Sequence, residues 1–178
     1  MQGASSNALV ERMVGVARLN VPTYEEIEHD QSAMPSAALI VVLAAIAGGI
    51  GSIGANGVTG LIGGIIGSLV AWAVFSFVAY FVGTRLLAAA TTSSSWQEVL
   101  RTLGFAYTPS LLAIFGFIPV IGPLIALVGA IWFLCTATIS LRQSLDMSTG
   151  RAIGVALISI IPALIVSGII LAIFGIGR

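Results

Sequence analysis

The sequence predicts an all-α integral membrane protein: a bundle of five transmembrane helices that follows a short cytosolic segment of amphipathic and acidic helices. Hydrophobic residues make up 58% of the chain, and charged residues only 8%. Three long segments, 31–84, 102–141 and 152–177, contain no Asp, Glu, Lys, Arg or His. About 20 apolar residues in a helix cross a bilayer core of roughly 30 Å, so these segments provide several membrane spans.

Composition divides the chain into two parts and excludes several classes of function. Residues 1–33 are the only substantial polar segment and form a head, whereas residues 34–178 form the membrane domain. A chain of 178 residues leaves no room for a separate catalytic module. All seven basic residues are arginines and the net charge is zero, so we expect no nucleic-acid partner.

Two short helices are expected in the head. Between residues 5 and 19, apolar residues recur at three- and four-residue spacing, the pattern of an amphipathic helix at a membrane interface. Asn20 and Pro22 then interrupt the chain. Thr23 and Glu26 resemble a capping box, which predicts the start of a second, acidic helix.

The first two spans are joined by an uncharged turn. The first begins near Pro35 and ends near Ser52, and the second covers 59–84 after a turn at 54–57. Small residues four positions apart on the second span allow a neighbouring helix to approach closely. The glycines expected at this helix contact are Gly60, Gly63, Gly64 and Gly67.

The third span is expected to begin as a capped helix and to bend. Serines at 93–95 precede Trp96, which is typical of a helix start, and the apolar stretch that follows contains Pro109. Proline removes a backbone donor and kinks a helix. Tyr107, Thr108 and Pro109 therefore form the best candidate for a polar pocket inside the membrane. The span is short, so both a complete crossing and a re-entrant loop fit it.

The fourth and fifth spans cover about 124–141 and 152–176, with a polar loop at 142–151 between them. Arginines flank the head, the second-to-third connection and the fourth-to-fifth connection, whereas the other two turns carry no charge. Positive residues concentrate on the cytoplasmic side of a membrane. Five spans therefore place the N-terminus in the cytoplasm and the C-terminus outside, in a plasma or inner membrane. A four-span arrangement would break this alternation.

Polar residues at fixed places among the spans resemble a known family. The strings that carry the resemblance are EEIEHDQSA at 25–33, GTRLL at 83–87, SSSWQEVLRTLGFAYTPSLL at 93–112, IPVIGPLIALVGAIW at 118–132 and RQSLDMSTGRAIGVALI at 142–158. They are similar to the short prokaryotic branch of the Yip1 domain family, over roughly 36–170. The resemblance implies five spans and a cytosolic N-terminus. Eukaryotic members associate with Rab GTPases in vesicle traffic, but a head this short does not carry that role over.

No set of residues in the sequence is suited to catalysis. His29 is the only histidine, and Glu25 and Glu26 share its helix face at a spacing that suits metal ligands. A second histidine is missing and the single cysteine, Cys135, lies in an apolar run, so we expect no enzyme, no metal and no cofactor. The spans also lack the ionisable side chains that ion-coupled transport needs.

We expect a non-enzymatic protein that organises the membrane or scaffolds other membrane proteins. Its partners would be lipids and other membrane proteins, or a second copy of the chain. One alternative is an accessory subunit of an energy-converting or transport complex, which predicts an apolar groove. Another is a passive solute or lipid pathway, which predicts a continuous cavity.

The head is expected to dock on the bundle through ion pairs with arginines of the cytoplasmic loops. The residues of this predicted clamp are Glu25, Glu26, Glu28, His29 and Asp30 in the head, and Arg85, Arg101, Arg142 and Arg151 in the loops.

Overall fold

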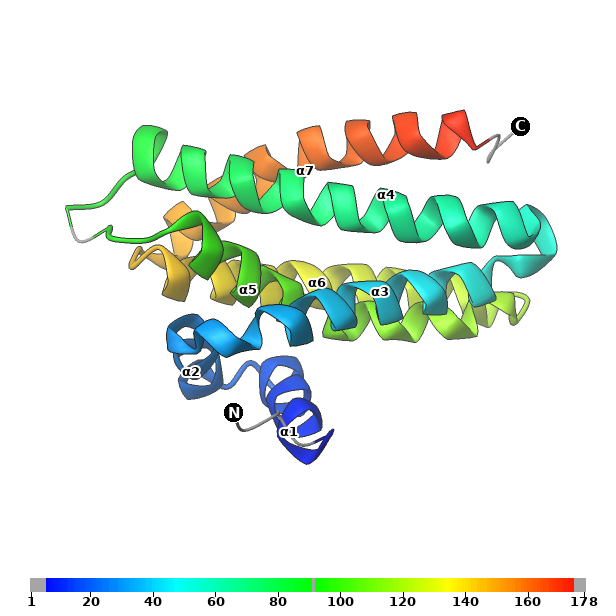
Figure 1. Cartoon of the computed structure of the whole chain (residues 1–178), viewed down its shortest axis with the longest axis horizontal. Helices are drawn as coiled ribbons and strands as arrows, with labels where there is room; N and C mark the ends of the chain where they lie inside the picture. The colour runs from blue at the N-terminus through cyan, green and yellow to red at the C-terminus, as the bar shows by residue number, and fades with distance from the viewer. Residues whose placement is uncertain (1–5, 91, 175–178) are drawn as a thin grey trace.

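The computed structural model describes residues 6–90 and 92–174, except for the side chains of 53–56 and 58, and every regular element in this part is helical (Figure 1). The elements in chain order are α1 (Ser6–Ala17), α2 (Val21–His29), η1 (Gln31–Ala33), α3 (Met34–Gly51), α4 (Ile53–Phe81), η2 (Val82–Leu86), α5 (Trp96–Ala106), η3 (Thr108–Phe117), α6 (Ile121–Ser144) and α7 (Thr149–Ile173). Five segments of the described chain are long and apolar enough to cross a membrane, which confirms the predicted all-α membrane fold.

The spans run along the long axis of the molecule, and α1 and α2 lie against one side of the bundle (Figure 1). α4 packs chiefly on α7 and α3, while η3 fits between α3 and α6. The first connection lies where predicted, because the segment that can cross the membrane begins only at Thr59, although α4 begins at Ile53. Its helical geometry is interrupted at Gly57, where φ is 55°. Only glycine adopts this left-handed backbone without steric cost, so Gly57 makes the turn.

The third span consists of two kinds of helix. α5 ends at Ala106, and Pro109 stands in the first turn of η3, a 3₁₀ helix of 10 residues. α5 contributes about 16 Å of rise and η3 about 20 Å, because a 3₁₀ helix rises more per residue than an α-helix. Together they exceed the roughly 30 Å of a bilayer core, so this segment is long enough for a complete crossing and not only for a re-entrant loop.

The starts of two helices test the predicted capped start of α5 and the predicted capping box of α2. Ser95 and Glu98 form one at α5: the Ser95 hydroxyl accepts from the Glu98 backbone N–H at 3.3 Å, and Glu98 Oε2 accepts from the Ser95 N–H at 2.7 Å. The capping box predicted at Thr23 is wrong, because α2 begins at Val21 and its N-cap is Asn20. Proline is favoured in the first turn of a helix, and Pro22 lies in the first turn of α2.

The glycines of α4 meet different surroundings. Gly60, Gly63 and Gly67 are buried, and a Cβ built on Gly67 would lie 3.6 Å from Ser167 Oγ of α7. Gly64 differs from the prediction, because a Cβ built there meets nothing within 4 Å. Closer helix approaches lie elsewhere: a Cβ on Gly104 of α5 would lie 2.6 Å from the Cβ of Ala37, and one on Gly51 of α3 would come closer still to the backbone oxygen of Ala113 in η3. The tight contact between α3 and α5 therefore depends on a glycine outside α4.

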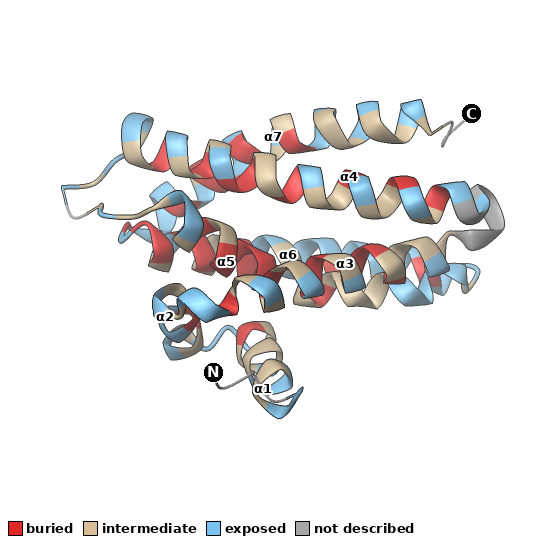
Figure 2. Cartoon of the chain, viewed as in Figure 1, coloured by how far each residue is buried: buried red, intermediate tan, exposed pale blue. Residues whose placement is uncertain are grey.

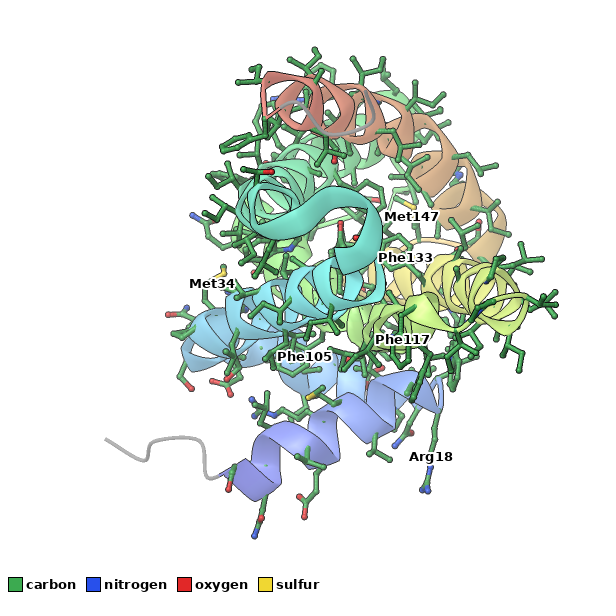
Figure 3. The ribbon with its side chains drawn as sticks, turned by 90° about the vertical axis from the view of Figure 1, so that its right-hand side faces the viewer. Arg18, Met34, Phe105, Phe117, Phe133 and Met147 are labelled. Atoms are coloured by element: carbon green, nitrogen blue, oxygen red, sulfur yellow. The ribbon has the colours of Figure 1, made fainter. Side chains whose placement is uncertain are left out.

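Burial is concentrated around α5, and the outside of the spans is apolar (Figure 2). Val99, Leu103 and Phe105 of α5 are fully buried. On α7, by contrast, Leu164 is 63% exposed and Ile173 is 76% exposed. Lipid tails solvate such side chains without cost, so this apolar surface fits a bundle that stands in a membrane. Viewed along the bundle, side chains project outward all around it, and Arg18 points away from it (Figure 3).

Candidate functional site

The acidic helix α2 is held by apolar side chains that face the bundle. Tyr24 and Ile27 are fully buried, and α2 packs on α5 and α6. The Tyr24 hydroxyl donates to the backbone oxygen of Val16 at 2.9 Å, which ties α2 to α1. Glu25 and Glu26 stand on the opposite, exposed face. Tyr24 and Ile27 are three positions apart, so they share one face of the helix.

Arg101 of α5 is the buried contact between the bundle and the head. Its side chain is only 5% exposed. The Nε–H donates to the backbone oxygen of Ile27 at 3.4 Å, and Nη2 donates to the backbone oxygen of Glu28. Both oxygens belong to the last turn of α2, where a helix leaves carbonyls unpaired and carries partial negative charge. Arg101 therefore caps the C-terminus of α2 from within the bundle.

A second arginine, Arg12 of α1, joins the two helices of the head. Its Nη2 lies 2.8 Å from Glu26 Oε1 and 2.7 Å from Asp30 Oδ2, and its side chain is 17% exposed. Hydrogen bonds from Ser32, together with Arg12, hold the pKa of Asp30 below its usual value. The three charged groups form a small network, and such networks stabilise more than isolated surface pairs do.

The predicted clamp is wrong about its partners: the head carboxylates do not form ion pairs with the loop arginines in the described part of the chain. Among the described residues, the head carboxylates form their ion pairs with Arg12, and Arg101 binds backbone oxygens instead. Arg85 and Arg142 are exposed, and Arg151 donates to the backbone oxygen of Ala88 at 3.0 Å. The physical reason is that Arg101 approaches the end of α2, where carbonyls are nearest, while Glu26 and Asp30 face Arg12 of α1.

Two further contacts hold the head and were not predicted. Gln143 Nε2 of α6 donates to Glu25 Oε1 at 3.0 Å. Trp132 Nε1 donates to the backbone oxygen of Ala17, the last residue of α1, at 2.8 Å. Trp132 stands halfway along α6, so the head lies beside the bundle and not above its end. Neither contact has a sequence signal, because each joins residues more than a hundred positions apart.

Glu28 is the most perturbed carboxyl group of the head. Burial raises the pKa of Glu28 to about 7; His29 opposes this shift, and Asp146, Glu98 and Glu25 add to it. His29 itself is exposed, and its Nδ1 lies 2.8 Å from the backbone oxygen of Glu25. This contact raises the pKa of His29. Both groups therefore favour their protonated forms in the folded head.

We expect the stability of the protein to fall as the pH rises from about 5 to about 8. A carboxyl group whose pKa is raised on folding binds its proton more tightly in the folded state, so this stabilisation is lost as the pH passes about 7. After allowance for solvent screening, the loss due to Glu28 is on the order of 1 kcal/mol. Thermal unfolding in detergent should show a shallower pH dependence for Glu28→Gln.

His29→Gln is the matched control for this measurement. The raised pKa of His29 acts in the same direction, so this variant removes only the part of the pH dependence that belongs to the imidazole. If Glu28→Gln keeps the full pH dependence of the wild type, Glu28 does not titrate in this range.

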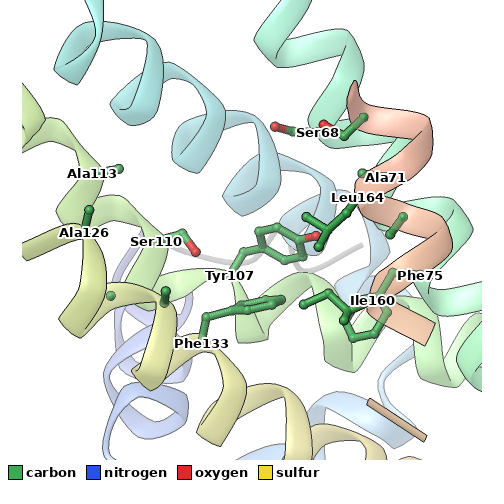
Figure 4. Close-up of a pocket in the computed structure, with 14 residues that line it drawn as sticks. Ser68, Ala71, Phe75, Tyr107, Ser110, Ala113, Ala126, Phe133, Ile160 and Leu164 are labelled. Carbon is green, nitrogen blue, oxygen red and sulfur yellow. The ribbon is translucent and has the colours of Figure 1, made fainter. Parts of the chain in front are cut away.

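The predicted pocket at the kink of the third span is part of a larger intramembrane cavity of about 370 Å³ (Figure 4). α4, η3, α6 and α7 line it, together with Tyr107 at the junction of α5 and η3. Tyr107 points into it, whereas the Thr108 hydroxyl donates to the backbone oxygen of Phe105 at 2.7 Å and Pro109 is buried. The lining ends at the aromatic side chains of Phe75 and Phe133.

The described residues contain no group of three or more His, Cys, Asp or Glu side chains that could hold a metal ion. The side chains that carry chemistry therefore fall into two sets. One is the head with its buried Arg101, and the other is the hydroxyl-lined cavity inside the bundle.

Comparison with known proteins gives one match. A family model described as the Yip1 domain matches residues 19–172. No curated protein and no solved structure matches the chain. The match begins just after α1 and ends in the last turn of α7, so it includes α2, Arg101 and all five spans.

Proposed function

Because the chain belongs to the Yip1 domain family, we propose that it is a non-enzymatic membrane protein that scaffolds other membrane proteins through its head. The observation that carries this proposal is the buried contact of Arg101 with the end of α2. A head fixed in this way presents one constant surface, and a preorganised surface binds a partner without the cost of ordering it first.

Charge placement supports a cytoplasmic head. Arg12 and Arg18 lie in or beside α1, and the four remaining described arginines lie at the ends of spans on the same side as the head. Positive residues are retained on the cytoplasmic side. We place the protein in a plasma or inner membrane with its N-terminus inside and its C-terminus outside.

A hollow beside Arg101 supports the head as a docking surface. Gln31, Ser95 and Gln97 line it, and the exposed amides of Gln31 and Gln97 give a partner hydrogen-bonding groups. Glu98 also lines it, so a partner with basic side chains fits best.

Site-specific photo-crosslinking tests this proposal in intact cells. A photoreactive residue at Gln31 or Gln97 should give an adduct with another membrane protein, whereas the same residue at Val120, exposed at the far end of the bundle, should not. Arg101→Met should lower the adduct yield at least tenfold, because the surface is no longer fixed. Arg85→Met is the matched control and should leave the yield unchanged.

The same positions also test the orientation. With Cys135 replaced by serine, a cysteine at Gln97 should react with a membrane-impermeant maleimide only after the cells are opened, and one at Val120 should react at once. Adducts that form equally at Val120 and Gln97, or labelling in the reverse order, would contradict the proposed docking role.

The cavity favours a second candidate function. An accessory subunit of a larger membrane complex predicts an apolar groove, and the cavity between α6 and α7 has that character. A passive pathway predicts a continuous cavity, and the lining described here stops at Phe75 and Phe133. A subunit would co-purify with one partner in constant proportion, whereas a scaffold would not.

A further inference from the structure

The intramembrane cavity contains a hydroxyl group for which the protein supplies no partner. Within the described part of the chain, the hydroxyls of Tyr107, Ser68, Ser110 and Ser167 line the cavity and make no hydrogen bond. Serine in a helix can turn its hydroxyl to a carbonyl of its own preceding turn, as Ser76 does with Trp72. A tyrosine hydroxyl cannot reach its own backbone, so Tyr107 remains an unpaired donor that faces the cavity.

The depth of Tyr107 limits which molecules can pair with it. Tyr107 stands near the middle of the span Trp96–Phe117, where no water is available to a lipid-facing group. The ester oxygens of phospholipids lie in the interfacial regions, about 15 Å from the midplane of a core roughly 30 Å thick. A phospholipid therefore brings only hydrocarbon to Tyr107. A suitable partner carries an oxygen into the middle of the membrane.

The shape of the cavity limits the occupant further. One end of its lining is aromatic: the ring centroids of Tyr107 and Phe133 lie 4.7 Å apart, and those of Phe75 and Phe133 lie 6.2 Å apart. The exposed lining residues Ala130 and Leu164 belong to α6 and α7, so the cavity opens between these helices toward lipid.

We propose that this cavity binds a membrane-dissolved molecule with a flat, carbonyl-bearing ring, of the isoprenoid quinone class. The ring lies against the aromatic end of the cavity, and the Tyr107 hydroxyl donates to one carbonyl oxygen. Ser110 and Ser167 are the donors available to the other carbonyl. The tail leaves between Ala130 and Leu164 into the surrounding lipid. The cavity volume falls within the range of ordinary small-molecule sites.

Fluorescence quenching in lipid nanodiscs tests this site with the full-length protein. Trp72 and Trp132 are sequence neighbours of the lining residues Ala71 and Phe133, so a quinone bound in the cavity should quench them. Decylubiquinone is the probe, in discs of phosphatidylethanolamine and phosphatidylglycerol. We expect saturable quenching in the wild type and at least a tenfold higher Kd for Tyr107→Phe.

Matched controls separate binding from collisions in the lipid. Tyr80→Phe removes a hydroxyl outside the cavity and should leave the Kd unchanged. Ala130→Phe fills the mouth and should abolish saturation, whereas Val128→Phe, on the exposed face of the same helix, should not. Thermal unfolding of each variant shows that it is folded.

Two results would overturn the proposal. Decylbenzene has the same tail and a ring without carbonyl oxygens, so equal affinity for it, measured by competition, would mean that the cavity accepts any hydrocarbon. Quenching that does not saturate, or a Kd that Tyr107→Phe leaves unchanged, would show that no carbonyl meets the tyrosine. Neither result bears on the head, so the docking role stands or falls separately.

Discussion

Replacing Arg101 by methionine is expected to release the head from the bundle. Methionine keeps much of the apolar stem but loses the guanidinium group, so the oxygens of Ile27 and Glu28 remain without their donor. A hydrogen bond to a charged group contributes about 1.5–3 kcal/mol, and the buried position of Arg101 argues for a total loss of about 3 kcal/mol. Such a loss raises the open fraction of the head about a hundredfold.

Limited trypsin digestion in detergent measures this opening. Cleavage after Arg12, which lies within α1 and is paired with Glu26 and Asp30, requires the head to open, so it should be about a hundredfold faster in Arg101→Met when opening and closing are fast. The cleavage rate of Arg101→Lys should fall between those of the wild type and Arg101→Met, because an ammonium group cannot reach both oxygens as a guanidinium does. Arg85→Met, an exposed site, is the control. Equal cleavage rates in the wild type and the three variants would exclude a capping role for Arg101.

Gly104→Ala is expected to destabilise the bundle although it adds only one methyl group. The new Cβ would lie 2.6 Å from the Cβ of Ala37 and 3.1 Å from its backbone oxygen, so α3 and α5 must move apart. Overpacking of this kind costs about 1–3 kcal/mol, and more where backbone atoms are in contact. Thermal unfolding in detergent should show a clear decrease in Tm.

Gly64→Ala is the matched control for this experiment, because it adds the same methyl group to another span. A Cβ at Gly64 meets nothing within 4 Å, and alanine in a helix is more favourable than glycine by about 0.5–1 kcal/mol. We therefore expect opposite signs: a lower Tm for Gly104→Ala and an unchanged or higher Tm for Gly64→Ala. Equal shifts would mean that the close approach of α3 and α5 does not limit stability.

The spans were predictable because their signal lies within single segments. Charge-free runs long enough to cross a bilayer give the five spans directly, and Ser95 with Glu98 gives the start of α5. Pro109 correctly indicated a break in the third span. The form of that break was not predictable, because a 3₁₀ helix depends on how η3 packs between α3 and α6.

The contacts between segments were harder to predict. The sequence contains the donor Arg101, but its acceptors are backbone oxygens, which every residue has. The glycines of α4 were predicted to pack against a helix because small residues recur there four positions apart. Gly104 is the only glycine of α5, so no such spacing marks it. Tyr107 was found because the neighbouring proline marked the site, although the aromatic residues of other spans that surround it could not be assigned to the same cavity.

The bond between Trp132 and Ala17 also determines how the protein occupies its membrane. Since Trp132 lies halfway along α6, α1 reaches toward the middle of the bundle, and Val10 and Val14 of α1 remain exposed there. We therefore expect lipids on one side of the midplane to surround the five spans together with the head helices, and on the other side to surround the spans alone. The protein therefore has a larger cross-section in one leaflet. A flat bilayer gives both leaflets equal area, so a molecule of this wedge shape fits best where the membrane is already curved.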